Sequence, residues 1–111
     1  MVDARVVKAV RHYLSVLRRD HGLPVDRAVV FGSHAKGSAD EWSDIDLVVV
    51  APNYDGTCSR NDVSLLWRVA AQTDSRIEPI PCGVRQWDED ESSAILEIAR
   101  REGQVILPDA A

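Results

Sequence analysis

The sequence predicts a small α/β (α+β) domain in which helices pack against one β-sheet. Segments with helical periodicity alternate with short β-branched runs, in the order helix, strand, strand, helix, strand, helix and a short last strand. The chain has 111 residues, and 45% of its composition is hydrophobic, which is enough for one compact core. Neither a repeat nor a low-complexity segment interrupts it. We therefore expect residues 1–111 to form a single domain.

The first half of the chain predicts one helix and two strands. Residues 3–19 place apolar side chains at three- and four-residue steps, which is typical of an amphipathic helix. Residues 25–31 are rich in valine and predict a strand, and residues 45–50, Ile-Asp-Leu-Val-Val-Val, form a stronger strand pattern. Between the strands, residues 32–43 hold glycine, serine and charged side chains. They are predicted to be a turn-rich connection.

The second half begins with a predicted helix and a predicted edge strand. Residues 61–72 have a helical apolar stripe, and Trp67 is expected in the core. Residues 76–81, Arg-Ile-Glu-Pro-Ile-Pro, predict a short strand. Because proline donates no backbone hydrogen bond, its two prolines place this strand at a sheet edge or make it irregular.

The C-terminal part predicts a helix followed by a short strand. The acidic run 88–91 is expected to be the solvated entry of a helix over residues 92–102, because negative charge favours a helix N-terminus. Gly103 is expected in the usual glycine position after that helix. Residues 105–107, Val-Ile-Leu, predict the last strand.

The charge balance limits the function classes. The net charge is -5, with 18 acidic and 13 basic residues. A nucleic-acid binder normally carries a basic face, so nucleic acid is an unlikely partner, although nucleotides bound with a metal ion are not excluded. The basic residues of the first helix are interpreted as a solvated face rather than a binding surface. With no membrane-length apolar run, no signal-peptide pattern and no Cys-x-x-Cys pair, a cytoplasmic protein with free thiols is expected.

The most informative pattern is Gly32-Ser33 followed after ten residues by Asp44-Ile45-Asp46. Side chains alternate along a strand, so Asp44 and Asp46 point to the same side. Two adjacent carboxylates repel each other, and Mg²⁺, which takes oxygen ligands, relieves that repulsion. Gly32 allows a sharp turn, and Ser33 with the N–H groups of a short helical turn offers an anion site to which Lys36 adds charge. The alternative is a plain turn with two solvated aspartates.

Glu78 is the candidate for a third carboxylate. It lies among apolar residues in the predicted strand 76–81, and a two-ion site needs one more ligand beside the Asp pair. The alternative interpretation is an edge-strand charge that prevents aggregation. Asp74, Asp88 and Asp90 are less favoured because each lies in a polar loop.

These residues resemble a known family. Residues 31–37, Phe-Gly-Ser-His-Ala-Lys-Gly, and residues 43–49, Ser-Asp-Ile-Asp-Leu-Val-Val, are similar to the minimal nucleotidyltransferases (MNT) of the DNA polymerase β-like superfamily. Residues 76–79 resemble the family's third-carboxylate strand, and residues 101–106 resemble its closing helix and strand. The resemblance implies a mixed sheet with helices on one face, and transfer of a nucleoside monophosphate from an NTP to a hydroxyl with release of pyrophosphate.

The resemblance also assigns roles. By position, Gly32 and Ser33 would hold the triphosphate, with Lys36 as a further phosphate contact. Asp44, Asp46 and Glu78 would bind two Mg²⁺ ions and carry the catalysis. Small members of the family pair with a helical HEPN protein as toxin and antitoxin, and the nucleotidyltransferase is the antitoxin that adenylylates its partner. ATP and a HEPN-type protein are therefore the implied substrate and partner.

The sequence leaves several interpretations open. His34 is either a phosphate contact or a solvent-facing turn residue, and Trp42 either stacks on a base or covers a sheet edge, the latter being favoured. The chain is either an active enzyme or a non-catalytic antitoxin of the same fold. A third reading, a small-molecule modifier of the aminoglycoside type, would need more chain to hold the acceptor.

Overall fold

The computed structural model describes residues 2–109 and is built around one mixed sheet of four strands. The strands are β1 (Arg27–Phe31), β2 (Ile45–Val50), β3 (Ile77–Cys82) and β4 (Gln104–Ile106), and their order across the sheet is β3-β2-β1-β4. β1 pairs antiparallel with both β2 and β4, whereas β2 and β3 are parallel. The predicted mixed sheet is therefore confirmed, and the proline-containing β3 lies at its edge as expected.

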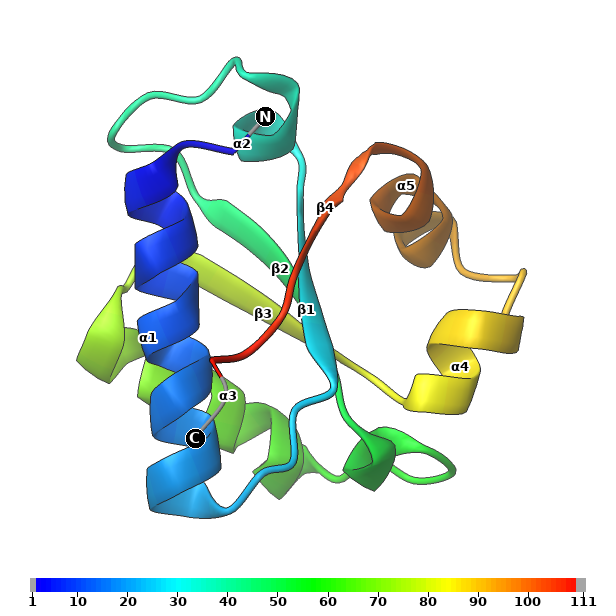
Figure 1. Cartoon of the computed structure of the whole chain (residues 1–111). Helices are drawn as coiled ribbons and strands as arrows, with labels where there is room; N and C mark the ends of the chain where they lie inside the picture. Colours follow the sequence, from blue (N-terminus) through cyan, green and yellow to red (C-terminus); the bar gives the residue numbers. More distant parts are fainter. Residues whose placement is uncertain (1, 110–111) are drawn as a thin grey trace.

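Two long helices cover one face of this sheet (Figure 1). They are α1 (Ala4–His21) and α3 (Arg60–Thr73), which bury their apolar stripes against β1, β2 and β3 in the larger of two cores. The fully buried Tyr13 of α1 donates its hydroxyl to the Leu66 carbonyl of α3 at 2.9 Å, which satisfies the phenol within the core. The two helices are thus held to each other as well as to the sheet.

The opposite face of the sheet is also covered, which differs from the one-sided packing expected from the sequence. α5 (Ala94–Glu102) packs Leu96 and Ala99 on the strand residues Val29, Val48 and Val50, and Figure 1 places α4 (Val84–Glu89) beside it. The physical reason lies in β2, whose residues are all buried except the half-buried Asp46. A continuous apolar run of this kind is typical of a strand covered on both faces.

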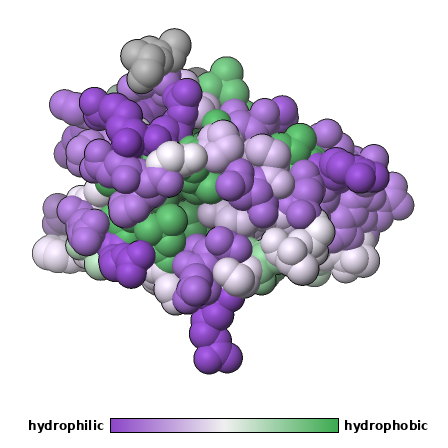
Figure 2. Space-filling view, turned by 90° about the horizontal axis from the view of Figure 1, so that it is seen from below, coloured by the Kyte–Doolittle hydropathy of each residue, from purple (hydrophilic) through white to green (hydrophobic). Residues whose placement is uncertain are grey.

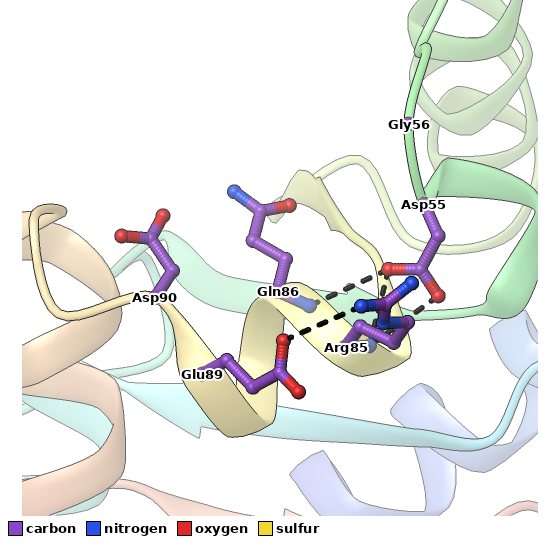
Figure 3. Close-up of a pocket in the computed structure, with 6 residues that line it drawn as sticks. All are labelled: Asp55, Gly56, Arg85, Gln86, Glu89 and Asp90. Atoms are coloured by element: carbon purple, nitrogen blue, oxygen red, sulfur yellow. Dashed lines mark hydrogen bonds and ion pairs between the residues drawn. The ribbon is translucent and has the colours of Figure 1, made fainter.

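The helix α4 was not predicted from the sequence, and its start is capped from a distant loop. Its N-cap residue, Gly83, has no side chain to accept the first N–H groups. Asp55, which follows the 3₁₀ turn Pro52–Tyr54, accepts from the Arg85 N–H at 3.1 Å and the Gln86 N–H at 3.4 Å (Figure 3). A Cβ on Gly83 would collide with this Asp55 side chain. A cap 30 residues away leaves no local sequence signal.

Two tryptophans lie on the surface rather than where the sequence placed them. Trp67 is 46% exposed and not in the core, because α3 buries the stripe formed by Leu66, Val69 and Ala70. Trp42 is 81% exposed in the loop before β2, so it covers no sheet edge. Seen from below, the surface is mostly hydrophilic, with an apolar area left of its centre and smaller ones elsewhere (Figure 2). No described helix is long and apolar enough to cross a membrane.

Gly103 ends α5 for a different reason from the one expected. Its φ is -80° and its ψ is 164°, so it does not adopt the left-handed conformation of a glycine cap. A Cβ at this position would collide with the Ala99 carbonyl oxygen and crowd the Val29 side chain and the Val30 carbonyl oxygen. The glycine is therefore required for the close approach of the α5–β4 connection to β1.

We predict that Gly103→Ala lowers the free energy of unfolding by about 1–3 kcal/mol, the range typical of overpacking. Backbone strain does not contribute, because alanine adopts this φ readily. Urea unfolding followed by circular dichroism measures the change, with Ser92→Ala at an exposed position as control. An unchanged unfolding midpoint would show that the α5–β4 connection moves away from β1 without cost.

Candidate functional site

The site begins at the turn that connects β1 to the short helix α2 (Ser33–Lys36). Gly32 forms this turn with φ 75° and ψ -148°, a conformation that is nearly restricted to glycine. A Cβ on Gly32 would also collide with the carboxylate of Asp46. Glycine is thus required twice, once for the backbone and once because the Asp46 side chain fills the space beside it.

The three carboxylates singled out in the sequence lie near this turn. Asp46 lies in β2 opposite Phe31 of β1 and opposite Glu78 of β3, so Asp46 and Glu78 are direct neighbours across the parallel pair. Asp44 precedes β2 and is exposed, whereas Asp46 and Glu78 are partly buried. The register of β2 against β3 therefore brings Glu78 to the Asp pair from 32 positions away in the sequence.

The carboxylates influence one another electrostatically. Burial raises the pKa of Glu78, and the negative charges of Asp44 and Asp46 raise it further. Burial also raises the pKa of Asp46, and the charge of Asp44 adds to this, while a hydrogen bond from Glu78 and the nearby His34 act in the opposite direction. The negative charges of the cluster thus disfavour the ionised forms of Asp46 and Glu78.

The donor chemistry of this cluster fits Mg²⁺. All three side chains offer hard oxygen atoms, and a divalent cation relieves the repulsion that raises their pKa values. Across residues 2–109, no three His, Cys, Asp or Glu side chains converge in a ready metal-ligand arrangement. The carboxylates are thus neighbours whose side chains have to rotate toward a common ion.

His34 fixes the loop that leads to these carboxylates. Its side chain is buried, with only 7% of its surface exposed, and its Nε2 lies 3.1 Å from the Ser43 carbonyl oxygen. This contact joins α2 to the residue immediately before Asp44. The sequence interpretations, a phosphate contact or a solvent-facing turn residue, did not include this contact with a backbone carbonyl group. The burial of His34 shows that it is not a solvent-facing residue.

The same loop is closed by a local turn. The Asp40 carboxylate accepts hydrogen bonds from the Trp42 N–H at 2.9 Å and from the Ser43 hydroxyl at 3.1 Å. These bonds hold the pKa of Asp40 below its usual value. An Asp that accepts from residues two and three positions on is a known turn pattern, so this support could have been found in the sequence.

Arg76 holds the start of β3 against this loop and engages Asp74. Its guanidinium binds Asp74 through two nitrogens, at 2.7 and 3.0 Å, and contacts the Glu41 carbonyl oxygen at 3.3 Å. The Arg76 side chain is the main cause of the lowered pKa of Asp74. Asp74 is therefore committed to an ion pair and not available as a third carboxylate, which favours Glu78. Asp88 and Asp90 lie in and just after α4, away from these strands.

Lys36 is not directed at the carboxylates in this structure. Its ammonium group lies 3.5 Å from the Glu102 carboxylate at the end of α5, and more than half of its side-chain surface is exposed. Ser33 is the first residue of α2, whose opening N–H groups have no partner within the helix. Ser33 and the Asp46–Glu78 pair thus meet around Gly32, whereas Lys36 lies on the α5 side.

A pocket of about 380 Å³ adjoins the loop side of this site. It lies where the start of α1 meets α2 and β3, and its lining includes Asp3, Arg5, His34, Glu41 and Arg76. A second pocket, of about 340 Å³, surrounds Asp55 and α4 (Figure 3) and contains none of the three carboxylates. The lining of the first pocket contains none of the three carboxylates either, but His34 and Arg76 connect it to the loop before Asp44, so this end of the molecule is the candidate site.

Comparisons with known proteins identify the family and the fold. The sequence model described as "Nucleotidyltransferase domain" matches residues 10–104. No curated protein matches the chain in sequence. A protein from Sulfolobus solfataricus assigned as a nucleotidyltransferase has a similar fold, with a TM-score of 0.62 and 16% identity over 91% of this chain and 78% of that one.

Two further solved structures come from toxin–antitoxin complexes. A chain of a toxin–antitoxin structure with AMP-PNP has a TM-score of 0.59 and 21% identity over 89% of this chain and 73% of that one. A chain from the complex of a tri-AMPylated Shewanella oneidensis HEPN toxin with its MNT antitoxin has a TM-score of 0.54 and 20% identity over 93% and 73%. At these identities the likeness establishes the fold.

The sequence match covers most of the chain, and it includes both the Gly32–Ser33 turn and the paired carboxylates of β2 and β3. This protein belongs to the nucleotidyltransferase domain family.

Proposed function

We propose that the chain is a Mg²⁺-dependent nucleotidyltransferase that transfers AMP from ATP to a hydroxyl group of a partner protein, as the antitoxin of a HEPN/MNT pair. The observation that carries this proposal is the pairing of Asp46 with Glu78 in the strand register, next to Asp44 and against the Gly32 turn. Three carboxylates thus lie near a turn whose Ser33 and His34 N–H groups are open, which supports binding of a cation and of phosphate. Both are needed for a triphosphate carrying metal ions.

The turn would hold the phosphates. The open N–H groups of the first α2 turn and the Ser33 hydroxyl donate to phosphate oxygens, and the absence of a side chain on Gly32 lets them approach closely. Lys36 reaches the phosphates by leaving Glu102. That ion pair is exposed, so its loss costs little.

The carboxylates would hold two Mg²⁺ ions, with Asp44, Asp46 and Glu78 as ligands. When bound, these ions neutralise charge on the phosphates and on the attacking and leaving oxygens. The acceptor hydroxyl oxygen forms a bond to the α-phosphorus of ATP, and the bond from that phosphorus to the oxygen bridging to the β-phosphate breaks, releasing pyrophosphate. The hydroxyl proton passes to a carboxylate, for which Glu78 is proposed.

The choice of ATP and of a protein acceptor rests on the similar structures. One of them contains AMP-PNP, and another holds a HEPN toxin that carries three AMP groups beside its MNT antitoxin. The fold is shared with these proteins, and the acidic cluster and Gly-Ser turn of this chain supply the corresponding chemistry. The alternative is a non-catalytic antitoxin of the same fold that acts by binding alone.

The direct test is a transfer assay with α-³²P-labelled ATP, CTP, GTP and UTP in Mg²⁺ buffer, with and without the protein encoded next to the chain's gene. We expect label from ATP on that protein, and none when Asp44→Asn replaces the wild type, because this variant lacks one metal-binding carboxylate. Asp88→Asn, at an exposed carboxylate of α4, is the matched control and should transfer normally.

Two results would contradict parts of this proposal. Full transfer by Asp44→Asn would remove the carboxylate cluster from catalysis. A stable complex that acquires no label from any of the four nucleotides would favour the non-catalytic antitoxin.

A second prediction concerns stability without metal. In EDTA at pH 7, Asp46→Asn is expected to raise the free energy of unfolding by up to about 1 kcal/mol, the size of a like-charge pair between neighbouring strands. The folded-state pKa values of Asp46 and Glu78 are raised, so the repulsion costs most above them and fades as the pH falls through them and both groups take up protons. The gain in the free energy of unfolding caused by Asp46→Asn should therefore be smaller at pH 4 than at pH 7.

Thermal unfolding at the two pH values, with and without Mg²⁺, measures these effects. Mg²⁺ should raise the melting temperature of the wild type more than that of Asp46→Asn, and Asp88→Asn should respond as the wild type does. If Mg²⁺ left the wild type unchanged and the variant gained nothing in EDTA, the cluster would not be a cation site.

A third prediction separates nucleotide binding from turnover. Ser33→Ala should weaken binding of a non-hydrolysable ATP analogue by about fivefold or more, because one hydrogen bond to a charged group is lost. Glu78→Gln should instead lower the transfer rate more than the affinity. Isothermal titration calorimetry and the labelled assay measure the two quantities. An unaltered affinity in Ser33→Ala would exclude Ser33 from the phosphate site.

A further inference from the structure

The positive charge of this acidic protein is concentrated on α1. The 18 residues of this helix include five Lys or Arg residues and a single acidic one, whereas the rest of the chain holds eight basic and 17 acidic residues. Such a separation of charge creates a local positive potential on one side of a negative molecule. The helix is therefore the surface on which an acidic partner would be attracted.

A groove runs along this helix next to the sheet edge. Its volume is about 740 Å³, which is larger than that of either pocket described above. It lies between α1 on one side and Gln104 of β4 and Asp109 on the other. Val2, Ala4 and Val7 give it an apolar part, while Lys8, Arg11 and Arg19 give it a basic wall. β4 is an outer strand of the sheet. The groove thus offers apolar contact and positive charge together.

The basic wall already holds an acidic residue of the chain itself. The Arg11 guanidinium lies 3.7 Å from the Asp109 carboxylate, and the Arg18 guanidinium donates to the Asp109 carbonyl oxygen at 2.6 Å. Both partners of the Arg11–Asp109 pair are largely exposed, so the pair is weak and a competing carboxylate can replace it. This contact indicates which chemistry the wall accepts, namely a carboxylate next to a backbone carbonyl group.

We infer that the groove between α1 and β4 is a docking site for an acidic segment of a partner protein that also carries apolar side chains. Its carboxylates pair with Lys8, Arg11 and Arg19, and its apolar side chains lie on the part of the groove formed by Val7 and its neighbours. The apolar part favours a polypeptide over a nucleic acid, whose charged backbone would leave this part uncovered.

The groove leads toward the candidate site. It begins at Val2 and Ala4, at the start of α1, and the pocket lined by Asp3, Arg5 and His34 lies at the same end of this helix. Figure 1 shows that this end of α1 is close to α2. A segment in the groove therefore leads toward the end of the molecule that holds the Gly32 turn. The inference rests on the proposed function only in taking this partner to be the acceptor protein.

The test uses no nucleotide, so it can fail independently of transfer. The probes are fluorescent peptides of about ten residues, one of Glu, Val and Ser and one in which Lys replaces every Glu, a length that matches an extended segment. Binding to the full chain is measured by fluorescence anisotropy at low and high salt. We expect the Glu peptide to bind, and to bind more weakly at high salt because the charges are screened.

The variants identify the surface. Lys8→Glu with Arg11→Glu should weaken binding of the Glu peptide at least about tenfold, whereas Lys8→Arg with Arg11→Lys should retain it. Arg60→Glu with Arg68→Glu, at exposed positions of α3, makes the same change in net charge outside the groove and should have no comparable effect. Circular dichroism establishes that each variant is folded.

Three outcomes would overturn the inference. The first is equal binding of the Glu and Lys peptides. The second is equal loss of binding in the α1 and α3 variants, which would reflect net charge alone. The third is self-association in analytical ultracentrifugation that the α1 reversal abolishes, which would assign the groove to a second copy of the chain. Transfer of AMP to a partner would stand in all three cases.

Discussion

The carboxylate of Asp46 occupies the space that a side chain on residue 32 would fill, and the arrangement of the site depends on this contact. It forces residue 32 to be glycine, and glycine in turn permits the positive φ from which α2 starts. The contact also fixes which side of β2 faces the turn. Because β2 is in register with both β1 and β3, the same side carries Glu78 into the cluster.

This cluster is tolerable because the sheet around it is firmly packed. Every other residue of β2 is buried, with α1 and α3 on one face and α5 on the other. Burial then raises the pKa values of Asp46 and Glu78, so the packing that stabilises the fold makes the carboxylates repel each other more strongly. Such a conflict between stability and local charge is typical of a functional site, where a bound cation removes it.

The supports around the cluster are polar and local. His34, the Asp40 turn and Arg76 each attach the loop before Asp44 to a different neighbour, namely α2, the loop itself and the start of β3. Together these polar contacts fix the conformation of an exposed loop that has few apolar contacts of its own. The start of the basic helix α1 borders the same region.

The sequence by itself determined the strands, the three main helices, the Gly32–Ser33 turn and the Asp44–Asp46 pair, because periodicity, turn residues and short motifs are local properties. It also contained the sign that β2 is covered on both faces, in a run of four consecutive apolar residues. Only the tertiary structure decided the pairing of Glu78 with Asp46, the commitment of Asp74 to Arg76, the Asp55 cap that starts α4 and the exposure of Trp67. Each of these depends on strand register or on contacts between distant segments, and no local pattern specifies which residues meet there.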